Sequence, residues 1–218
     1  MRLRKRKNFD RRWAAVPPQY CEQQPETRRG RWRGQWPSLR LEIGCGKGLY
    51  LSRQAALHPR CLFIGVERDP SAALMAMELA ARQGLTNAVF IHGDAQCLPL
   101  WFSENELDRI DILFCDPWPE TRYAKRRLTN RRHLAAVLPL LRKDGLLCFR
   151  TDNEALFDYS LKELEAVGLH PVSATRNLHG GDSEPGESMT GYEQQFVAQG
   201  KPILQAKCTA GRTAALAT

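Results

Sequence analysis

The sequence predicts an α/β fold in which about seven strands form a mostly parallel, doubly wound sheet. Three observations lead to this prediction. Short apolar segments of strand length alternate with segments of helical periodicity along most of the chain. A glycine-rich turn follows the first apolar segment. Acidic residues follow five of the segments, as expected where a parallel sheet builds a ligand site at the carboxyl ends of its strands.

The predicted elements alternate between strand and helix, and their boundaries rest on turn and capping residues. Residues 61–67 are an almost continuous apolar run, which is typical of a parallel strand buried on both faces. His58 and Pro59 end the first helix, and Gly84 and Gly168 end the second and the fourth. Strands are expected at residues 39–44, 61–67, 88–92, 109–115, 145–151, 171–177 and 203–208, and helices at 48–57, 71–83, 131–141 and 154–167.

The turn after the first strand contains three alternating glycines, Gly44, Gly46 and Gly48. Glycine tolerates a positive φ and lets a ligand approach the backbone closely. The G-x-G-x-G spacing differs from the G-x-G-x-x-G of dinucleotide sites, and Glu42 lies two residues before the first glycine. A carboxylate there suits an amine or sulfonium and repels a phosphate. The alternative is a glycine turn with a purely structural role.

Five carboxylates follow five predicted strands. Because the carboxyl ends of parallel strands meet at one edge of a sheet, we expect these side chains to converge on one crevice. A carboxylate after the second strand can accept hydrogen bonds from both ribose hydroxyls of an adenosine. Any one of these acids is also a common turn or helix-cap residue, but capping does not explain the joint pattern. The five are Glu42, Glu67, Asp94, Asp116 and Asp152.

The positive charge lies at the N-terminus. Residues 1–36 carry eleven Lys and Arg against three acids, which accounts for the whole net charge of +8. We therefore expect a basic N-terminal arm over residues 1–36, a globular domain over 37–210 and a flexible tail over 211–218. Such an arm is attracted to nucleic acid. The tryptophans that lie between its basic residues can stack on exposed nucleobases. The tryptophans are Trp13, Trp32 and Trp36, and the alternative is a solubilising tail.

The composition and the spacing of residues argue against a disulfide-bonded, metal-binding, membrane-spanning or secreted protein. The seven cysteines are scattered, odd in number and without a C-x-x-C pair, so we expect reduced thiols in a cytoplasmic protein. The five histidines show no metal-ligand spacing, and we expect no metal. No apolar run has the length of a membrane span, and no secretory signal follows the basic start.

Two further segments carry candidate chemistry. Asp116-Pro117-Trp118-Pro119 leads into a basic run, where a bound nucleic-acid backbone would present a base to Asp116 and Trp118. A solvated basic helix face is the alternative. Thr190-Gly191-Tyr192-Glu193 follows a polar loop and, alone, has the pattern of a capping box at a helix start. The basic residues of the run after Pro119 are Arg122, Lys125, Arg126, Arg127, Arg131 and Arg132.

Together these segments resemble the bacterial tRNA (guanine-N7-)-methyltransferases, S-adenosylmethionine-dependent enzymes with a Rossmann-like methyltransferase fold. The glycine turn is shared with all such methyltransferases. The Asp-Pro-Trp-Pro run with its basic tract, combined with Thr-x-Tyr-Glu, is specific to the family. The matching stretches lie at residues 1–4, 42–48, 63–67, 116–119, 125–129, 151–153 and 190–193, which span nearly the whole chain.

The resemblance implies methyl transfer to N7 of a guanine in the variable loop (position 46) of tRNA, by a monomer or homodimer. It assigns the cofactor site to Glu42, Gly44, Gly46, Glu67, Asp94 and Asp116, with Asp116 also catalytic. It assigns guanine binding to Asp152, Thr190, Gly191, Tyr192 and Glu193, and tRNA contact to Arg122, Lys125, Arg126 and Arg127.

One position departs from the family pattern. Glu120 stands where the family usually has a lysine, so a substrate role cannot be transferred to it. The glycine turn is also compatible with two other functions. One is a methyltransferase acting on another RNA base or on a protein, and the other is a non-catalytic RNA-binding protein of the same fold.

Overall fold

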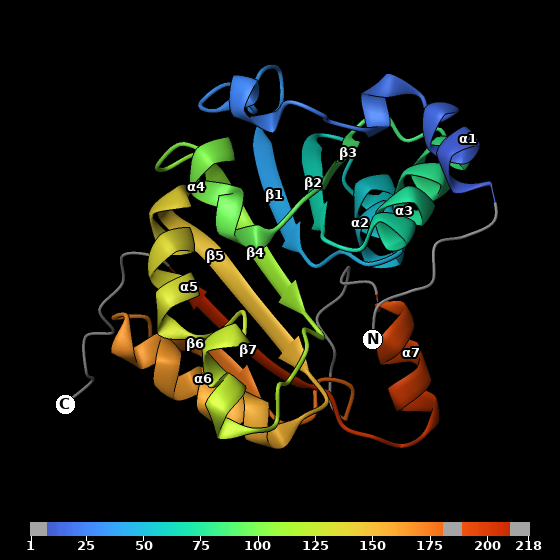
Figure 1. Cartoon of the computed structure of the whole chain (residues 1–218). Coiled ribbons are helices and arrows are strands. Elements are labelled where there is room, and N and C mark those ends of the chain that lie inside the picture. The colour runs from blue at the N-terminus through green and yellow to red at the C-terminus, as the bar shows by residue number, and fades with distance from the viewer. Residues whose placement is uncertain (1–7, 181–188, 210–218) are drawn as a thin grey trace.

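The computed structural model describes residues 8–180 and 189–209, and within them one seven-stranded sheet organises the molecule (Figure 1). The strand order is β3-β2-β1-β4-β5-β7-β6. The first five of these strands are parallel, and β7 runs antiparallel to both β5 and β6. The predicted fold is therefore confirmed. The strands are β1 Ser38–Ile43, β2 Cys61–Glu67, β3 Ala88–His92, β4 Leu107–Leu113, β5 Leu141–Thr151, β6 Pro171–Thr175 and β7 Leu204–Thr209.

The helices lie close to the predicted positions, with one clear difference. The helix predicted over 131–141 ends at Val137, because Pro139 has no N–H to continue the helical hydrogen bonding. Strand β5 then begins at Leu141, four residues before the predicted start. The helices are α1 Phe9–Ala14, α2 Leu49–Leu57, α3 Pro70–Arg82, α4 Leu98–Trp101, α5 Arg131–Val137, α6 Glu154–Ala166 and α7 Gly191–Ala198.

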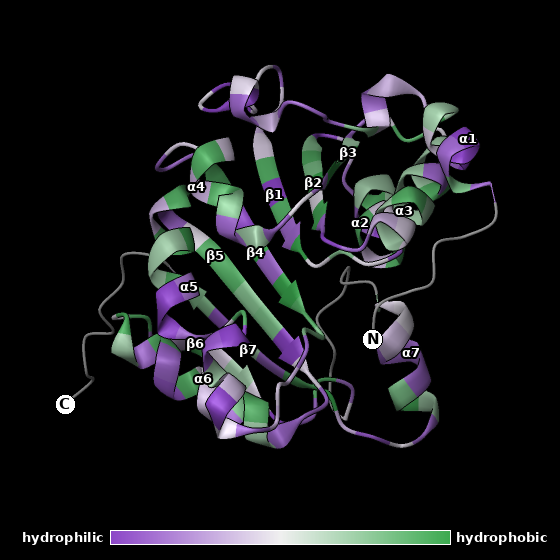
Figure 2. Cartoon of the chain, viewed as in Figure 1, coloured by the Kyte–Doolittle hydropathy of each residue, from purple (hydrophilic) through white to green (hydrophobic). Residues whose placement is uncertain are grey.

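Helices cover both faces of the sheet, as a doubly wound fold requires. Successive residues of β2 show why the strand is apolar throughout. Phe63 packs in a core with α2 and α3, whereas Leu62 and Ile64 pack in a larger core with α4, α5 and α6. Figure 2 shows the mainly hydrophobic strands between these helices, and a hydrophilic α1 at the periphery. Among the described residues, no helix is long and apolar enough to cross a membrane.

The segment before β1 packs on the domain and does not form a separate arm over residues 8–36. Trp32 is fully buried, and its Nε1 donates a hydrogen bond of 2.8 Å to the carbonyl of Trp101. Glu106 accepts hydrogen bonds from the backbone N–H groups of Gly30 and Trp32, at 3.0 and 2.9 Å. The expectation that Trp32 stacks on nucleic-acid bases is therefore wrong, because its ring is part of the core.

The start of this segment contacts α3. Arg12 on α1 donates to Glu78 on α3 through Nε at 2.8 Å and through a second nitrogen. Its charge is thus neutralised by the domain before any nucleic acid binds. The remainder of the predicted basic arm, residues 1–7, and the predicted tail over 211–218 lie outside the described residues.

The strand order gathers the predicted carboxylates at one edge of the sheet. Strand β1 lies between β2 and β4, so the connection from β1 runs to one side of it and the connection from β3 returns to its other side. Ligands of doubly wound sheets bind at this point, beyond the carboxyl ends of the strands. Across the edge the acids follow the order Asp94, Glu67, Glu42, Asp116 and Asp152.

Candidate active site

The glycine turn connects β1 to α2 and needs glycine for two different reasons. Gly46 has a φ of +56°, and an added Cβ would meet no atom within 4 Å. Its requirement is conformational, and the space beside it stays open for a ligand. Gly48 also has a positive φ, but its added Cβ would lie 2.7 Å from Cβ of Ala76. The turn therefore packs tightly on α3 through Gly48.

Glu67 at the end of β2 holds the turn in place. Its Oε2 accepts a hydrogen bond of 2.9 Å from the backbone N–H of Gly46. Its Oε1 accepts one of 2.7 Å from the backbone N–H of Asp69. A carboxylate has about four lone-pair sites, so both oxygens retain capacity for ribose hydroxyls. Glu67 thus supports the glycine turn and keeps acceptor capacity for the ribose contact that the sequence predicts.

Glu42 is a buried acceptor beside the same turn. Its side chain is on β1 with 6% of the residue exposed, and its Oε2 has no hydrogen-bond partner among the described residues. Burial raises the pKa of Glu42 well above its usual range, and repulsion from Asp111 and Glu67 adds to the shift. Arg150 and the N–H of Leu51 oppose it. A cationic ligand would stabilise the ionised form.

The raised pKa of Glu42 predicts that affinity for a cationic ligand beside it depends on pH. A raised folded-state pKa means that the folded protein binds the proton more tightly, so stability falls as pH rises through the window between the unfolded and folded values. A cation binds best to the ionised carboxyl. We therefore expect affinity for a cationic cofactor to rise with pH, by at most about tenfold per pH unit.

Replacing Glu42 with Gln tests this dependence. We expect Glu42→Gln to bind the cofactor more weakly than the ionised wild type does, with an affinity that changes little with pH. Calorimetric titration at several pH values measures both quantities. An unchanged pH profile in the variant would show that another group titrates.

The other two predicted cofactor acids differ in their surroundings. Asp94 accepts a hydrogen bond of 2.9 Å from the backbone N–H of Gln96, so it caps the turn that follows β3. Asp116 is exposed beyond the end of β4. It lies between Phe114 and Trp118, whose φ values are +52° and +41°. Two bulky residues in the left-handed region mark a strained segment, which is common at functional sites.

Asp152 follows β5 and is half-buried. The helix-cap alternative for this residue is excluded, because the neighbouring Asn153 caps α6. The side-chain oxygen of Asn153 accepts a hydrogen bond of 2.8 Å from the backbone N–H of Leu156. The carboxylate of Asp152 is thus not required to start the helix.

The segment Thr190–Glu193 forms the N-terminal turn of α7, and its capping box is present. Thr190 Oγ1 accepts from the backbone N–H of Glu193 at 2.9 Å, and the Glu193 carboxylate accepts from that of Thr190 at 3.0 Å. Glu193 is fully buried, whereas Tyr192 is 63% exposed. Tyr192 packs near Phe114, with ring centroids 6.4 Å apart. The segment therefore presents Tyr192, and not Glu193, at the surface.

The basic run forms a short 3-10 helix over Thr121–Arg126, and its members differ in freedom. Arg126 is exposed and lies 5.0 Å from the ring centroid of Trp118 and 4.7 Å from that of Tyr123. Arg127 is half-buried and donates to the carbonyl of Trp118 at 2.9 and 3.3 Å. Arg127 thus supports the strained segment around Trp118. Arg126 offers an exposed positive charge.

Lys125 is exposed. Arg122 is exposed and forms an ion pair with Glu120, with 2.6 Å between Nη2 and Oε2. The acid that departs from the family pattern therefore neutralises one of the predicted tRNA contacts while no tRNA is bound.

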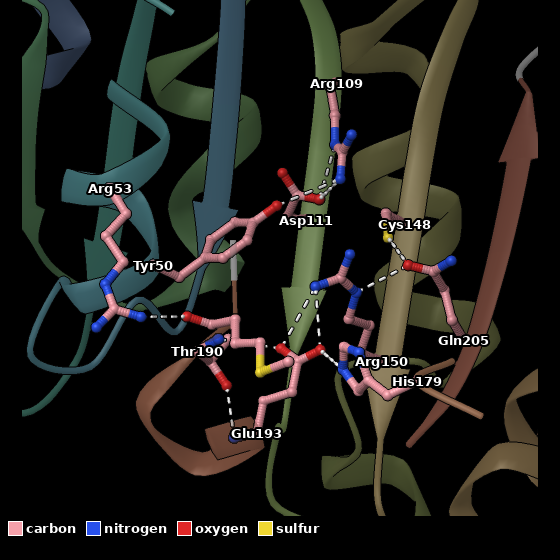
Figure 3. Close-up of polar contacts among 11 residues, drawn as sticks. Tyr50, Arg53, Arg109, Asp111, Cys148, Arg150, His179, Thr190, Glu193 and Gln205 are labelled. Atoms are coloured by element: carbon pink, nitrogen blue, oxygen red, sulfur yellow. Dashed lines mark hydrogen bonds and ion pairs between the residues drawn. The ribbon is translucent and has the colours of Figure 1, made fainter. Parts of the chain in front are cut away.

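Sequence reasoning missed a buried polar network behind the site (Figure 3). Arg150 on β5 is 1% exposed and lies 3.4 Å from both carboxylate oxygens of Glu193. Its Nε donates to Gln205 on β7 at 2.8 Å. His179 also contacts Glu193, at 2.8 Å. The signal in the sequence was a single arginine in the apolar run of β5.

Comparison with known proteins assigns the chain. A family described as putative methyltransferase matches residues 37–206. A tRNA (guanine-N(7)-)-methyltransferase of Geobacillus kaustophilus (strain HTA426) is 40% identical over 219 residues, which cover 97% of both chains. The chain belongs to the tRNA (guanine-N(7)-)-methyltransferase family. The family resemblance seen in the sequence is therefore confirmed. A second member, from Halalkalibacterium halodurans, is 39% identical and covers 94% of each chain.

Solved structures support the methyltransferase fold. The 16S rRNA methyltransferase KamB superposes with a TM-score of 0.61 at 14% identity, covering 82% of this chain and 90% of that one. An antibiotic-related methyltransferase gives a TM-score of 0.59 at 22% identity, covering 81% and 88%. At these identities the likeness concerns the fold alone.

The methyl donor of this methyltransferase family is S-adenosylmethionine, and the edge of the sheet fits it. The buried oxygen of Glu42, which has no hydrogen-bond partner in the part of the chain that the structure describes, can accept a cationic group. The open space beside Gly46 admits a ligand close to the backbone. Glu67 adds an acceptor at the end of the neighbouring strand. Among the described residues, no group of three or more His, Cys, Asp or Glu could hold a metal ion.

Proposed function

We propose that this protein transfers the methyl group of S-adenosylmethionine to N7 of a guanine in the variable loop of tRNA, at position 46. The observation that carries the proposal is the gathering of three features at one sheet edge in a member of this family. These are the buried acceptor Glu42, the exposed Asp116 and the basic segment over residues 121–127. A non-catalytic RNA-binding protein would not need a buried carboxylate poised for a cationic ligand.

The residues divide into a cofactor half and a substrate half. Glu42 and Glu67 lie at the ends of β1 and β2, and Asp94 follows β3. All three would bind the cofactor around the glycine turn. Asp152 follows β5, and the Thr190–Tyr192 turn begins α7. Together they would bind the guanine. Asp116 follows β4, between the two halves, and would face both ligands.

The chemistry requires positioning more than proton removal. Bound S-adenosylmethionine supplies an electrophilic methyl group, and guanine N7 already carries a lone pair on its groove edge. A carboxylate such as Asp152 accepts hydrogen bonds from the N1–H and N2–H₂ donors and so orients N7. Alignment of the two reacting atoms can supply most of the rate enhancement. Nearby carboxylates also stabilise the positive charge that forms on the methylated base.

The assignment is tested by mapping the methylated base. Unmodified tRNA is incubated with the protein and isotopically labelled S-adenosylmethionine, then digested and sequenced at the modified position. We expect label on N7 of a guanine in the variable loop. Label on another base or on protein would replace the proposed substrate, and cofactor binding without transfer would favour the non-catalytic alternative.

The basic segment makes a separate prediction about tRNA affinity. We expect Arg126→Ala to weaken tRNA binding about fivefold and to reduce the slope of log affinity against log salt by about 1, because one phosphate contact releases about one counterion. Binding isotherms at several salt concentrations measure the slope. The matched control is Arg82→Ala, since Arg82 ends α3 at the opposite edge of the sheet and is exposed. Equal slopes for the two variants would remove Arg126 from the tRNA interface.

A further inference from the structure

Helix α7 cannot hold its place through its own stability. It comprises eight residues, Gly191–Ala198, and isolated helices shorter than about 12 residues are marginal in water. Its position therefore depends on contacts with other elements. Because its first turn contains the predicted guanine-binding residues, any element that fixes α7 also fixes the substrate half of the site.

The first anchor of α7 is the buried carboxylate of Glu193 (Figure 3). A fully buried carboxylate is costly unless hydrogen-bond donors surround it. Two side chains from outside the helix contact it, Arg150 on β5 at 3.4 Å and His179 at 2.8 Å. The His179 contact is the shorter of the two, and His179 lies on the turn after β6, in a different part of the chain.

The second anchor reaches α7 from the cofactor half. Arg53 on α2 donates to the carbonyl of Met189 at 3.1 Å, just before the helix begins. With the Gln194 amide turned to present its oxygen, Arg53 also donates to it at 2.6 and 3.2 Å. An added Cβ at Gly191 would lie 2.9 Å from Cδ1 of Leu49, so the first turn of α7 lies close to the start of α2. Helix α7 is thus held from both halves of the site.

We propose that His179 and Arg53 are positioning residues of the methyl transfer, which fix the first turn of α7 so that the guanine meets the methyl donor in line. This inference rests on the proposed function. His179 acts through Glu193 and the capping box, and Arg53 acts through the backbone that enters the helix. Neither side chain needs to touch a ligand.

Substitution of His179 tests the first contact. Leu fills a similar volume without a donor, whereas the amide of Gln can reach the Glu193 oxygen from a position close to Nε2. We expect His179→Leu to lower kcat about 10- to 100-fold, because misplacement of a substrate by about 1 Å costs up to 100-fold. KM for tRNA and the Kd of the cofactor should change less than about twofold. His179→Gln should recover most of the rate.

Two further variants keep the test independent of folding effects at one position. Arg53→Met removes the second anchor without disturbing the buried carboxylate, and we expect the same loss of kcat with KM preserved. His170→Leu is the control, because His170 is exposed and precedes β6. Wild-type kcat in His179→Leu, or equal loss in the Gln and Leu variants, would overturn the role of His179. Wild-type kcat in Arg53→Met would overturn the role of Arg53.

Hydrogen exchange separates this inference from the proposed function. In both anchor variants the amides of α7 should exchange faster than in the wild type, while those of β1 and β4 keep their protection. Unchanged exchange in α7 would overturn the anchoring. If the wild type methylates a target other than guanine N7, the proposed function fails, and the exchange result still decides whether His179 and Arg53 hold the helix.

Discussion

Replacement of Asp152 with Asn should lower methyl transfer to tRNA by about 100-fold or more, because a misoriented N7 loses its in-line approach. Asn retains the size of the side chain but places an amide donor where the guanine edge offers donors of its own. Because we expect adenosine to bind at residues of other strands, affinity for the cofactor should stay within about twofold. Single-turnover rates with tRNA and calorimetric titration with the cofactor measure the two effects.

The capping of α6 supplies the matched control for this experiment. Asn153 is the N-cap, so Asn153→Ala should cost about 1 kcal/mol of stability. Asp152→Asn should cost little stability, because it leaves the cap intact. Wild-type turnover in Asp152→Asn would refute guanine recognition by this residue. Loss of cofactor binding would instead place Asp152 in the cofactor half.

Replacement of Glu67 with Ala should weaken cofactor binding by about 2–4 kcal/mol, or roughly 30- to 1000-fold, because charge-assisted hydrogen bonds to the ribose are lost. The structure adds a second cause. Glu67 also accepts from the N–H groups of Gly46 and Asp69, so the glycine turn loses its support when the carboxylate is removed. Calorimetric titration of the folded variant, with its secondary structure checked by circular dichroism, measures the loss.

A comparison of Gln with Ala at position 67 separates these causes. Glu67→Gln keeps one acceptor oxygen, which can serve either Gly46 or the ribose, but loses the charge. We expect Gln to retain part of the affinity that Ala loses. Unchanged cofactor affinity in Glu67→Ala would remove the residue from the site altogether.

Local patterns were sufficient to predict the strands of the sheet and the edge at which the acids gather. Strands β2 and β3 have the predicted bounds, since a strand buried on both faces is a continuous apolar run in the sequence. The antiparallel placement of β7 between β5 and β6 was not predicted. It depends on pairing between segments far apart in the chain, which no local periodicity records.

The polar contacts of the site were less predictable than its acids. Asp94, Asp116 and Asp152 were identified from their positions after strands. The partners of Glu193 could not be identified in this way, because Arg150 and His179 meet it only when β5, the turn after β6 and α7 have assembled. Trp32 was misinterpreted for a similar reason. Its neighbours in sequence are basic, but its neighbours in space are Trp101 and Phe102.

The position of β7 has a consequence for the order in which a growing chain can fold. The acids that we assign to the cofactor lie at or just after the ends of β1, β2 and β3, all of which leave the ribosome before β5. Strand β6 is made before β7, yet among the described strands it pairs only with β7. Until β7 emerges, the outer edge of β5 exposes unpaired backbone groups, which are prone to association with other chains. The strands that carry the predicted cofactor acids are therefore synthesised first, and the nascent chain carries an aggregation-prone edge until β7 is synthesised.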